Sequence, residues 1–150
     1  MTFKIETKFQ ALDLKVAAET GVIEGYASVF GIEDNGGDVV MPGAFAGSLT
    51  GRSGSGVKML WQHDPAQPIG IWDEIKEDDK GLWIKGRLLT EIQKGKEAAV
   101  LMAAGAIDGL SIGYRTLRSK NGEGSQRMLE EVELWEVSVV TFPMLPEATD

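Results

Sequence analysis

The segments LSIGYRTL (residues 110–117), KNGEG (120–124) and MLEEVELWEVSVV (128–140) decide the fold class. The first and last segments contain many β-branched and aromatic residues, which favour strands. The middle segment places glycines beside an asparagine, which is typical of a tight turn between antiparallel strands. The stretch therefore predicts a long β-hairpin.

Outside this hairpin, apolar and polar residues alternate in several short segments, as expected for half-buried strands. The predicted strands cover residues 3–9, 22–30, 57–61, 69–76 and 82–89. The last two flank EDDKG (residues 77–81) and should form a second hairpin. Short strands joined by hairpins favour a closed or nearly closed antiparallel β-barrel.

Two helices complete the prediction. Residues 91–104 are rich in helix-forming Ala, Leu, Met, Lys and Glu. Thr90 and Gln93 fit a capping box at the start of this helix, and Gly105 fits its end. Residues 42–49 are a weaker candidate. The expected fold class is mainly β with a few helices (α+β), in a single domain spanning residues 1–150. We expect core or barrel-lining positions for Trp61, Trp72, Trp83 and Trp135.

The composition excludes several kinds of site. A net charge of −8 disfavours nucleic-acid binding and adhesion to anionic membranes. Without cysteine the chain cannot use disulfides, thiol nucleophiles or thiolate metal sites. A metal would need carboxylates, but the loop at residues 34–38 lacks EF-hand spacing, so we expect neither metal nor cofactor. No apolar stretch fits a signal peptide or a membrane span, which predicts a cytoplasmic site of action.

The chain has one histidine, His63, which follows the apolar segment 57–61. Imidazole is the usual base that activates a serine hydroxyl, and Ser111 lies between glycines in an apolar setting. Gly109 to Gly113 match the G-x-S-x-G pattern, but the order of elements is wrong for an α/β-hydrolase elbow, because a helix precedes the serine. The alternative is structural: a hydrogen-bonded histidine and a glycine-rich start of a strand.

A third group would orient the imidazole, and Glu131, Glu133 and Glu136 are candidates. Strand alternation places Glu136 and Ser138 on one face, which is either solvated or buried with a partner. The opposite face then carries Trp135, Val137 and Val139. The small neighbours of the candidate serine leave room for a substrate carbonyl. We expect the oxyanion donors to be the backbone N–H groups around Ile112 and Gly113.

Several blocks, taken in order, resemble the tailed-phage prohead protease family of head-maturation serine proteases. The matching blocks are DNGGDVVMPGAF (34–45), WQHD (61–64), PIG (68–70), GLSIGY (109–114) and LWEVSVVTFP (134–143). The resemblance spans residues 25–148. Because this family is related in fold to the herpesvirus assemblins, it implies an assemblin-like β-barrel surrounded by helices.

The resemblance also implies the roles of the candidate residues. It gives the order base, nucleophile, third member, which here is His63, Ser111 and Glu136. Assemblins use a second histidine as third member, and this chain has none, so the resemblance implies that an acid takes the role. It points to Glu136 in the block that contains Glu-Val-Ser-Val-Val.

The implied function is a serine endopeptidase that removes scaffold segments from the major capsid protein precursor and then cleaves itself. It would act inside the assembling prohead in the host cytoplasm, with a homo-oligomer, a dimer by analogy with assemblins, as the expected state. Family members continue into a longer C-terminal tail, so we expect this chain to be trimmed, autoprocessed or naturally short. The alternatives are a noncatalytic capsid-associated β-barrel that binds or decorates the capsid, and an esterase of small molecules.

Overall fold

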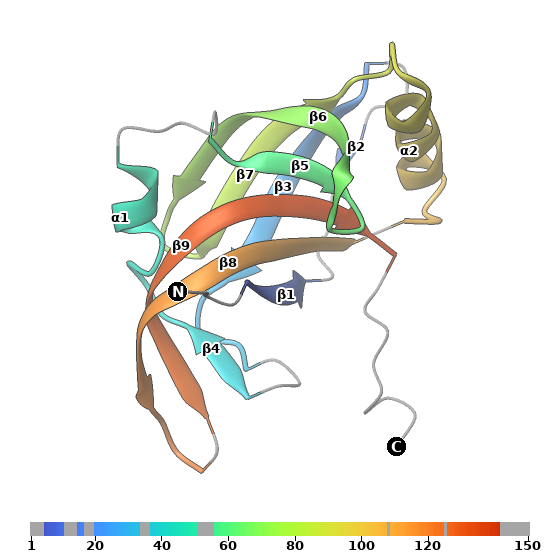
Figure 1. Cartoon of the computed structure of the whole chain (residues 1–150). Helices are drawn as coiled ribbons and strands as arrows, with labels where there is room; N and C mark the ends of the chain where they lie inside the picture. The colour runs from blue at the N-terminus through green and yellow to red at the C-terminus, as the bar shows by residue number, and fades with distance from the viewer. Residues whose placement is uncertain are drawn as a thin grey trace.

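The computed structural model describes residues 5–10, 15–16, 20–33, 37–50, 56–107, 109–124 and 126–141. Within these ranges it has nine strands and two helices (Figure 1). They are β1 (Glu6–Gln10), β2 (Lys15–Val16), β3 (Val22–Val29), β4 (Asp38–Val40), α1 (Ala46–Leu49), β5 (Lys58–Trp61), β6 (Asp64–Glu77), β7 (Gly81–Leu88), α2 (Gln93–Ala103), β8 (Gly109–Asn121) and β9 (Arg127–Val140). Much of the predicted loop at 34–38, and the last two residues of the block 134–143, lie outside the described residues.

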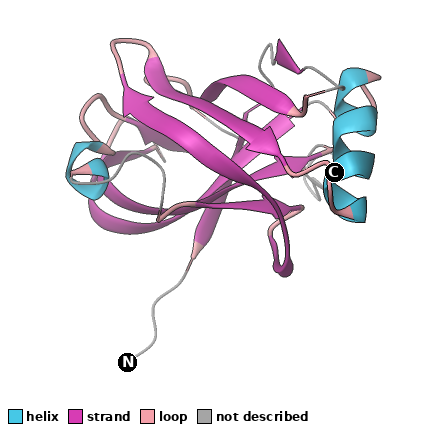
Figure 2. Cartoon of the chain, turned by 90° about the horizontal axis from the view of Figure 1, so that it is seen from above, coloured by secondary structure: helices cyan, strands magenta, loops and turns pink. Residues whose placement is uncertain are grey.

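The strands form one curled sheet in the order β1-β8-β9-β5-β6-β7-β3-β2, and β4 pairs with the start of β9. Among the described strands β1 pairs with β8 alone and β2 with β3 alone. The sheet is therefore a half-barrel that is open rather than closed, with the helices at opposite ends (Figure 2). The mainly β class with a few helices is confirmed, and of the predicted closed or nearly closed barrel the structure has a curled half-barrel that stays open.

The sequence predicts an antiparallel sheet, but the observed sheet also contains parallel pairs. β4 and β5 each run parallel to β9, and β5 pairs Lys58 with Glu136 and Leu60 with Ser138. β5 then turns directly into β6, with which it forms an antiparallel hairpin. The parallel pairing thus brings the tip of the β5–β6 hairpin to the C-terminal half of β9.

The predicted helices form, with altered starts. α2 begins after Ile92, and no side chain caps it, so the capping box at Thr90 is wrong. The reason is that the chain first makes a turn in which the Ile92 N–H donates to the Leu89 carbonyl at 3.1 Å. Gly105 follows the helix with φ of 81°, as expected for a glycine that ends a helix. α1 is a single turn that covers only the second half of the predicted segment.

A β-bulge interrupts the pairing of β8 with β9 at Trp135. Gly113 pairs with Glu136, but the next residue, Tyr114, pairs with Leu134, so Trp135 is the extra residue. The bulge shifts the alternation along β9, and Trp135 is 40% exposed although it was expected in the core. Beyond the bulge the prediction holds, because Val137 faces the core.

The core lies inside the curl of the sheet and draws on most strands and on α2. Of the other tryptophans, Trp72 is buried, and its indole N–H donates to the Val137 carbonyl at 3.2 Å. Trp61 is partly buried against the core, and Trp83 is half-buried beneath Lys76. The largest fully buried side chains are those of Trp72, Tyr114, Phe45, Ile23, Met59, Ile69, Leu82, Ile84, Leu110, Ile112, Leu129 and Leu134.

Candidate active site

His63 lies in the two-residue turn that joins β5 to β6. Trp61 pairs with Asp64, so Gln62 and His63 are the two central residues. Both have positive φ, 53° and 64°, which is the pattern of a type I′ turn. Asn and Gly usually occupy such turns, since the left-handed conformation costs other residues about 1–2 kcal/mol each. The histidine therefore sits in a backbone conformation that its surroundings must hold.

Strand β9 supplies that support. The Gln62 N–H donates to the Val139 carbonyl at 3.0 Å, and the His63 N–H donates to Ser138 Oγ at 3.1 Å. On the far side of the turn, the Asp64 carboxylate accepts hydrogen bonds from the Gln67 amide and the Ala66 N–H. These two bonds lower the pKa of Asp64. The turn is fixed from both sides.

The imidazole of His63 uses both nitrogens. Nε2 lies 2.7 Å from Ser111 Oγ, and Nδ1 lies 2.5 Å from Glu136 Oε2. An ionised carboxylate can only accept, so the proton on the ring belongs on Nδ1, and Nε2 is left to accept from the serine hydroxyl. The structure thus brings together the three residues that the sequence singled out.

Register explains why the serine and the glutamate lie side by side. Ser111 on β8 pairs with Ser138 on β9, and Gly113 pairs with Glu136. A Cβ at position 113 would lie 2.8 Å from Cδ of Glu136, so the glycine leaves the space into which this carboxylate folds. Glu136 is only 9% exposed, which excludes a simply solvated face.

The other two acids lie away from the imidazole. Glu133 forms an ion pair with Arg115 at 3.2 Å, and Glu131 lies 3.8 Å from Arg118. Both carboxylates belong to cross-strand pairs along the outer part of the β8–β9 hairpin. Of the three candidate acids, Glu136 therefore has the geometry of a third member.

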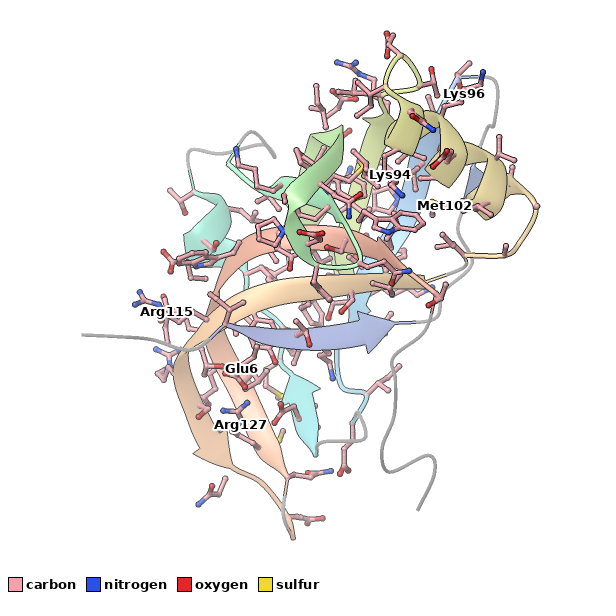
Figure 3. The ribbon with its side chains drawn as sticks, turned by 45° about the vertical axis from the view of Figure 1, so that its right-hand side comes forward. Glu6, Lys94, Lys96, Met102, Arg115 and Arg127 are labelled. Carbon is pink, nitrogen blue, oxygen red and sulfur yellow. The ribbon has the colours of Figure 1, made fainter. Side chains whose placement is uncertain are left out.

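Polar contacts also hold the neighbouring elements in place. Arg127 of β9 binds both Glu6 of β1 and Asp38 of β4, which raises the pKa of its guanidinium (Figure 3). These contacts attach the edge strand β1 to the rest of the sheet. β1 pairs with β8 at the position of Ser111. On the other side, Lys94 of α2 lies 4.8 Å from the ring of Trp61, directly before the histidine turn.

Comparison with known proteins identifies the family of the chain. A model of the caudovirus prohead serine protease family matches residues 6–150. The chain belongs to this family. It is 34% identical over 131 residues to the prohead protease of Enterobacteria phage HK97, covering 85% of this chain and 58% of that protein. It is 30% identical over 132 residues to the prohead protease of Escherichia phage T5, covering 85% and 60%.

Two further similarities extend the comparison. A capsid polyprotein of Pseudomonas phage PAJU2 is 33% identical over 100 residues, which is 62% of this chain and 15% of that protein. The structure of the bacteriophage T4 capsid assembly protease superposes with a TM-score of 0.69 at 15% identity, covering 92% of this chain and 96% of that one. The last match shows a shared fold. This prohead protease family member spans less than two thirds of the length of the two prohead proteases it matches.

The predicted oxyanion donors, the backbone N–H groups around Ile112 and Gly113, lie on β8, which is flanked by β1 and β9. Ile112 pairs with Lys8 of β1 on one side and Val137 of β9 on the other, and Gly113 is likewise flanked by both strands. Amides inside a sheet usually donate to neighbouring strands. The role of these two amides as oxyanion donors stays a prediction.

Sequence reasoning about this family member missed the role of Ser138 in the site. Its hydroxyl accepts from the His63 N–H and donates to Glu136 Oε1 at 2.6 Å. The available signal was the alternation that placed it on the same face as Glu136. Among the described residues, no cluster of three or more His, Asp or Glu side chains could hold a metal ion, and no helix is long and apolar enough to cross a membrane.

Proposed function

We propose that this chain is a serine endopeptidase of phage head maturation in which Ser111 is the nucleophile, His63 the general base and Glu136 the orienting acid. One observation carries the proposal: the imidazole contacts the serine hydroxyl through one nitrogen and the carboxylate through the other. The noncatalytic alternative expects His63 and Ser111 to lie far apart, so the 2.7 Å contact favours catalysis.

The proposed chemistry follows from these contacts. Ser111 Oγ attacks the scissile carbonyl carbon while His63 Nε2 takes the hydroxyl proton. The tetrahedral intermediate then collapses, the peptide C–N bond breaks, and Nε2 returns the proton to the leaving amine. Water, deprotonated by the same nitrogen, attacks the acyl-enzyme and releases the acid and the serine. Glu136 keeps the Nδ1 proton in place and stabilises the imidazolium that forms in each half-reaction.

The proposed substrates are the scaffold segment of the major capsid protein precursor and, afterwards, the enzyme itself. The names of the HK97 and T5 relatives support a site of action within the assembling prohead, in the host cytoplasm. The match to a segment of a capsid polyprotein supports a capsid protein as partner. We also propose that the active form is a homo-oligomer, which sedimentation of the purified chain would test.

Co-expression with the capsid precursor of the same phage tests the function. Mass spectrometry should detect defined cleavage products with the wild type, and Ser111→Ala should reduce their rate of formation by roughly 10⁴ to 10⁶. Normal processing by Ser111→Ala would refute the mechanism. Small esters, assayed in parallel, separate the esterase alternative: rapid ester hydrolysis without precursor cleavage would favour it.

A further inference from the structure

Ser138 is the one serine that lies directly opposite Ser111 across the β8–β9 pair, and it also pairs with Leu60 of β5. Its side chain is completely buried. Its hydroxyl makes two hydrogen bonds, accepting from the backbone N–H of His63 at 3.1 Å and donating to Glu136 Oε1 at 2.6 Å. The Ser138 hydroxyl therefore contacts the backbone of His63 and the carboxylate that binds its imidazole.

The chemistry of the three groups fixes the direction of both bonds. A serine hydroxyl has one proton to donate and two lone pairs that accept. An amide N–H can only donate and an ionised carboxylate can only accept, so the hydroxyl proton must point to Glu136. The other carboxylate oxygen of Glu136 then receives the Nδ1 proton of His63. The contacts form a closed ring from the His63 main chain, through Ser138 and Glu136, to the His63 side chain.

We propose that Ser138 is a positioning residue of this enzyme, which couples the backbone of the His63 turn to the Glu136 carboxylate. The proposal rests on the proposed peptidase function. The bond to the backbone holds His63 in its left-handed conformation, and the bond to Oε1 fixes the carboxylate rotamer. Together the two bonds keep His63 Nδ1 within hydrogen-bond distance of Glu136 Oε2, so that Nε2 faces Ser111.

Removal of the hydroxyl should affect turnover and not substrate binding. In Ser138→Ala, the Glu136 carboxylate loses a hydrogen bond of the strength made to charged groups, and the histidine turn loses an anchor. We expect kcat to fall roughly 10- to 100-fold. KM should stay unchanged, because a completely buried hydroxyl does not contact substrate.

A second readout does not depend on activity. Since the chain has a single histidine, every imidazole signal in an NMR spectrum belongs to His63. Long-range ¹H–¹⁵N correlation spectra of the Ser111→Ala background, which prevents self-cleavage, report which ring nitrogen carries the proton. We expect the Nδ1–H form to dominate, with its proton shifted downfield by Glu136, and Ser138→Ala in this background to mix the tautomers and weaken that shift.

Matched variants make the test specific. Ser28→Ala removes another buried serine hydroxyl of the same sheet, one that has no hydrogen-bond partner among the described residues, and should change neither kcat nor the tautomer. Ser138→Thr keeps the hydroxyl and should recover most of the activity. If Ser138→Ala does not fold, Ser138→Cys carries the same prediction, because a thiol is only a weak donor and acceptor.

The outcomes separate the two proposals. Wild-type kcat and an unchanged tautomer in the folded Ser138 variants, with Ser111→Ala inactive, would overturn the positioning role and leave the peptidase intact. Full activity of Ser111→Ala would overturn the peptidase mechanism itself. A lower kcat at unchanged KM, together with a mixture of His63 tautomers, supports the role of Ser138.

Discussion

Gly113→Ala should impair the peptidase without unfolding it. The added Cβ would lie 2.8 Å from Cδ and 2.9 Å from Cγ of Glu136, and closer still to Oε2. Carbon atoms in contact prefer separations of about 3.5–4.0 Å, so the carboxylate must retreat by roughly an ångström. A displacement of that size in a catalytic group costs about 10²-fold in rate. We therefore expect kcat for precursor cleavage to fall about 10²-fold.

Kinetics on the purified chain and thermal unfolding by circular dichroism measure the two effects separately. Gly47→Ala is the matched control, because its Cβ meets only the end of the Glu131 side chain, at 3.3 Å, and activity should be retained. The variant Gly113→Ala/Glu136→Gln should be no slower than Glu136→Gln alone, since both changes act through one carboxylate. Wild-type kcat in Gly113→Ala, or full additivity in the double variant, would refute the reasoning.

Three further outcomes are expected. Glu136→Gln should lower kcat about 10⁴-fold, because a neutral amide favours the wrong tautomer, whereas Glu133→Gln should cost less than about threefold; a larger loss at position 133 would reverse the assignment. Gln62→Gly should raise the free energy of unfolding in urea by about 0.5–1 kcal/mol, since relief of the left-handed penalty exceeds the entropy cost of glycine; a lower value would mean that the turn is not strained. Tyr26→Phe should raise the pKa of Asp78 toward its usual 3.8, because the phenol hydroxyl that donates to it at 2.5 Å is lost. The pKa of Asp78 is lowered in the folded chain, so its contribution to stability is present above about pH 4 and lost as the pH falls further; NMR titration of the wild type and of Tyr26→Phe measures the change.

Much of the site could be predicted because it depends on local patterns. The apolar segment before His63 marks β5, so the histidine had to lie where a strand ends. Alternation along 128–140 placed Glu136 and Ser138 on one face, and the structure agrees because the strand is regular beyond the bulge. The small neighbours of Ser111 were expected to leave room for a substrate carbonyl or to mark the start of a strand. In the structure, Gly113 leaves space for the carboxylate of its cross-strand partner.

The remaining features depend on register, which a single strand does not encode. The bulge at Trp135 appears only when β8 and β9 are aligned, and it moves this tryptophan out of the core. The parallel pairing of β5 with β9 joins segments that are distant in sequence, so hairpin signals could not reveal it. The same limit applies to the surroundings of Ile112 and Gly113, because the pairing of β1 with β8 also joins segments that are distant in sequence.

The route of the chain through the sheet has a consequence for when the enzyme can act. His63 is 48 residues from Ser111 and 73 from Glu136, and it belongs to a different hairpin. The two hairpins meet through the parallel pairing of β5 with β9, a contact whose loop must close before it contributes. In the proposed mechanism, a partly folded chain therefore keeps the general base apart from the nucleophile. The proposed peptidase would become active only when the sheet is complete, and unfinished chains would leave their neighbours uncut.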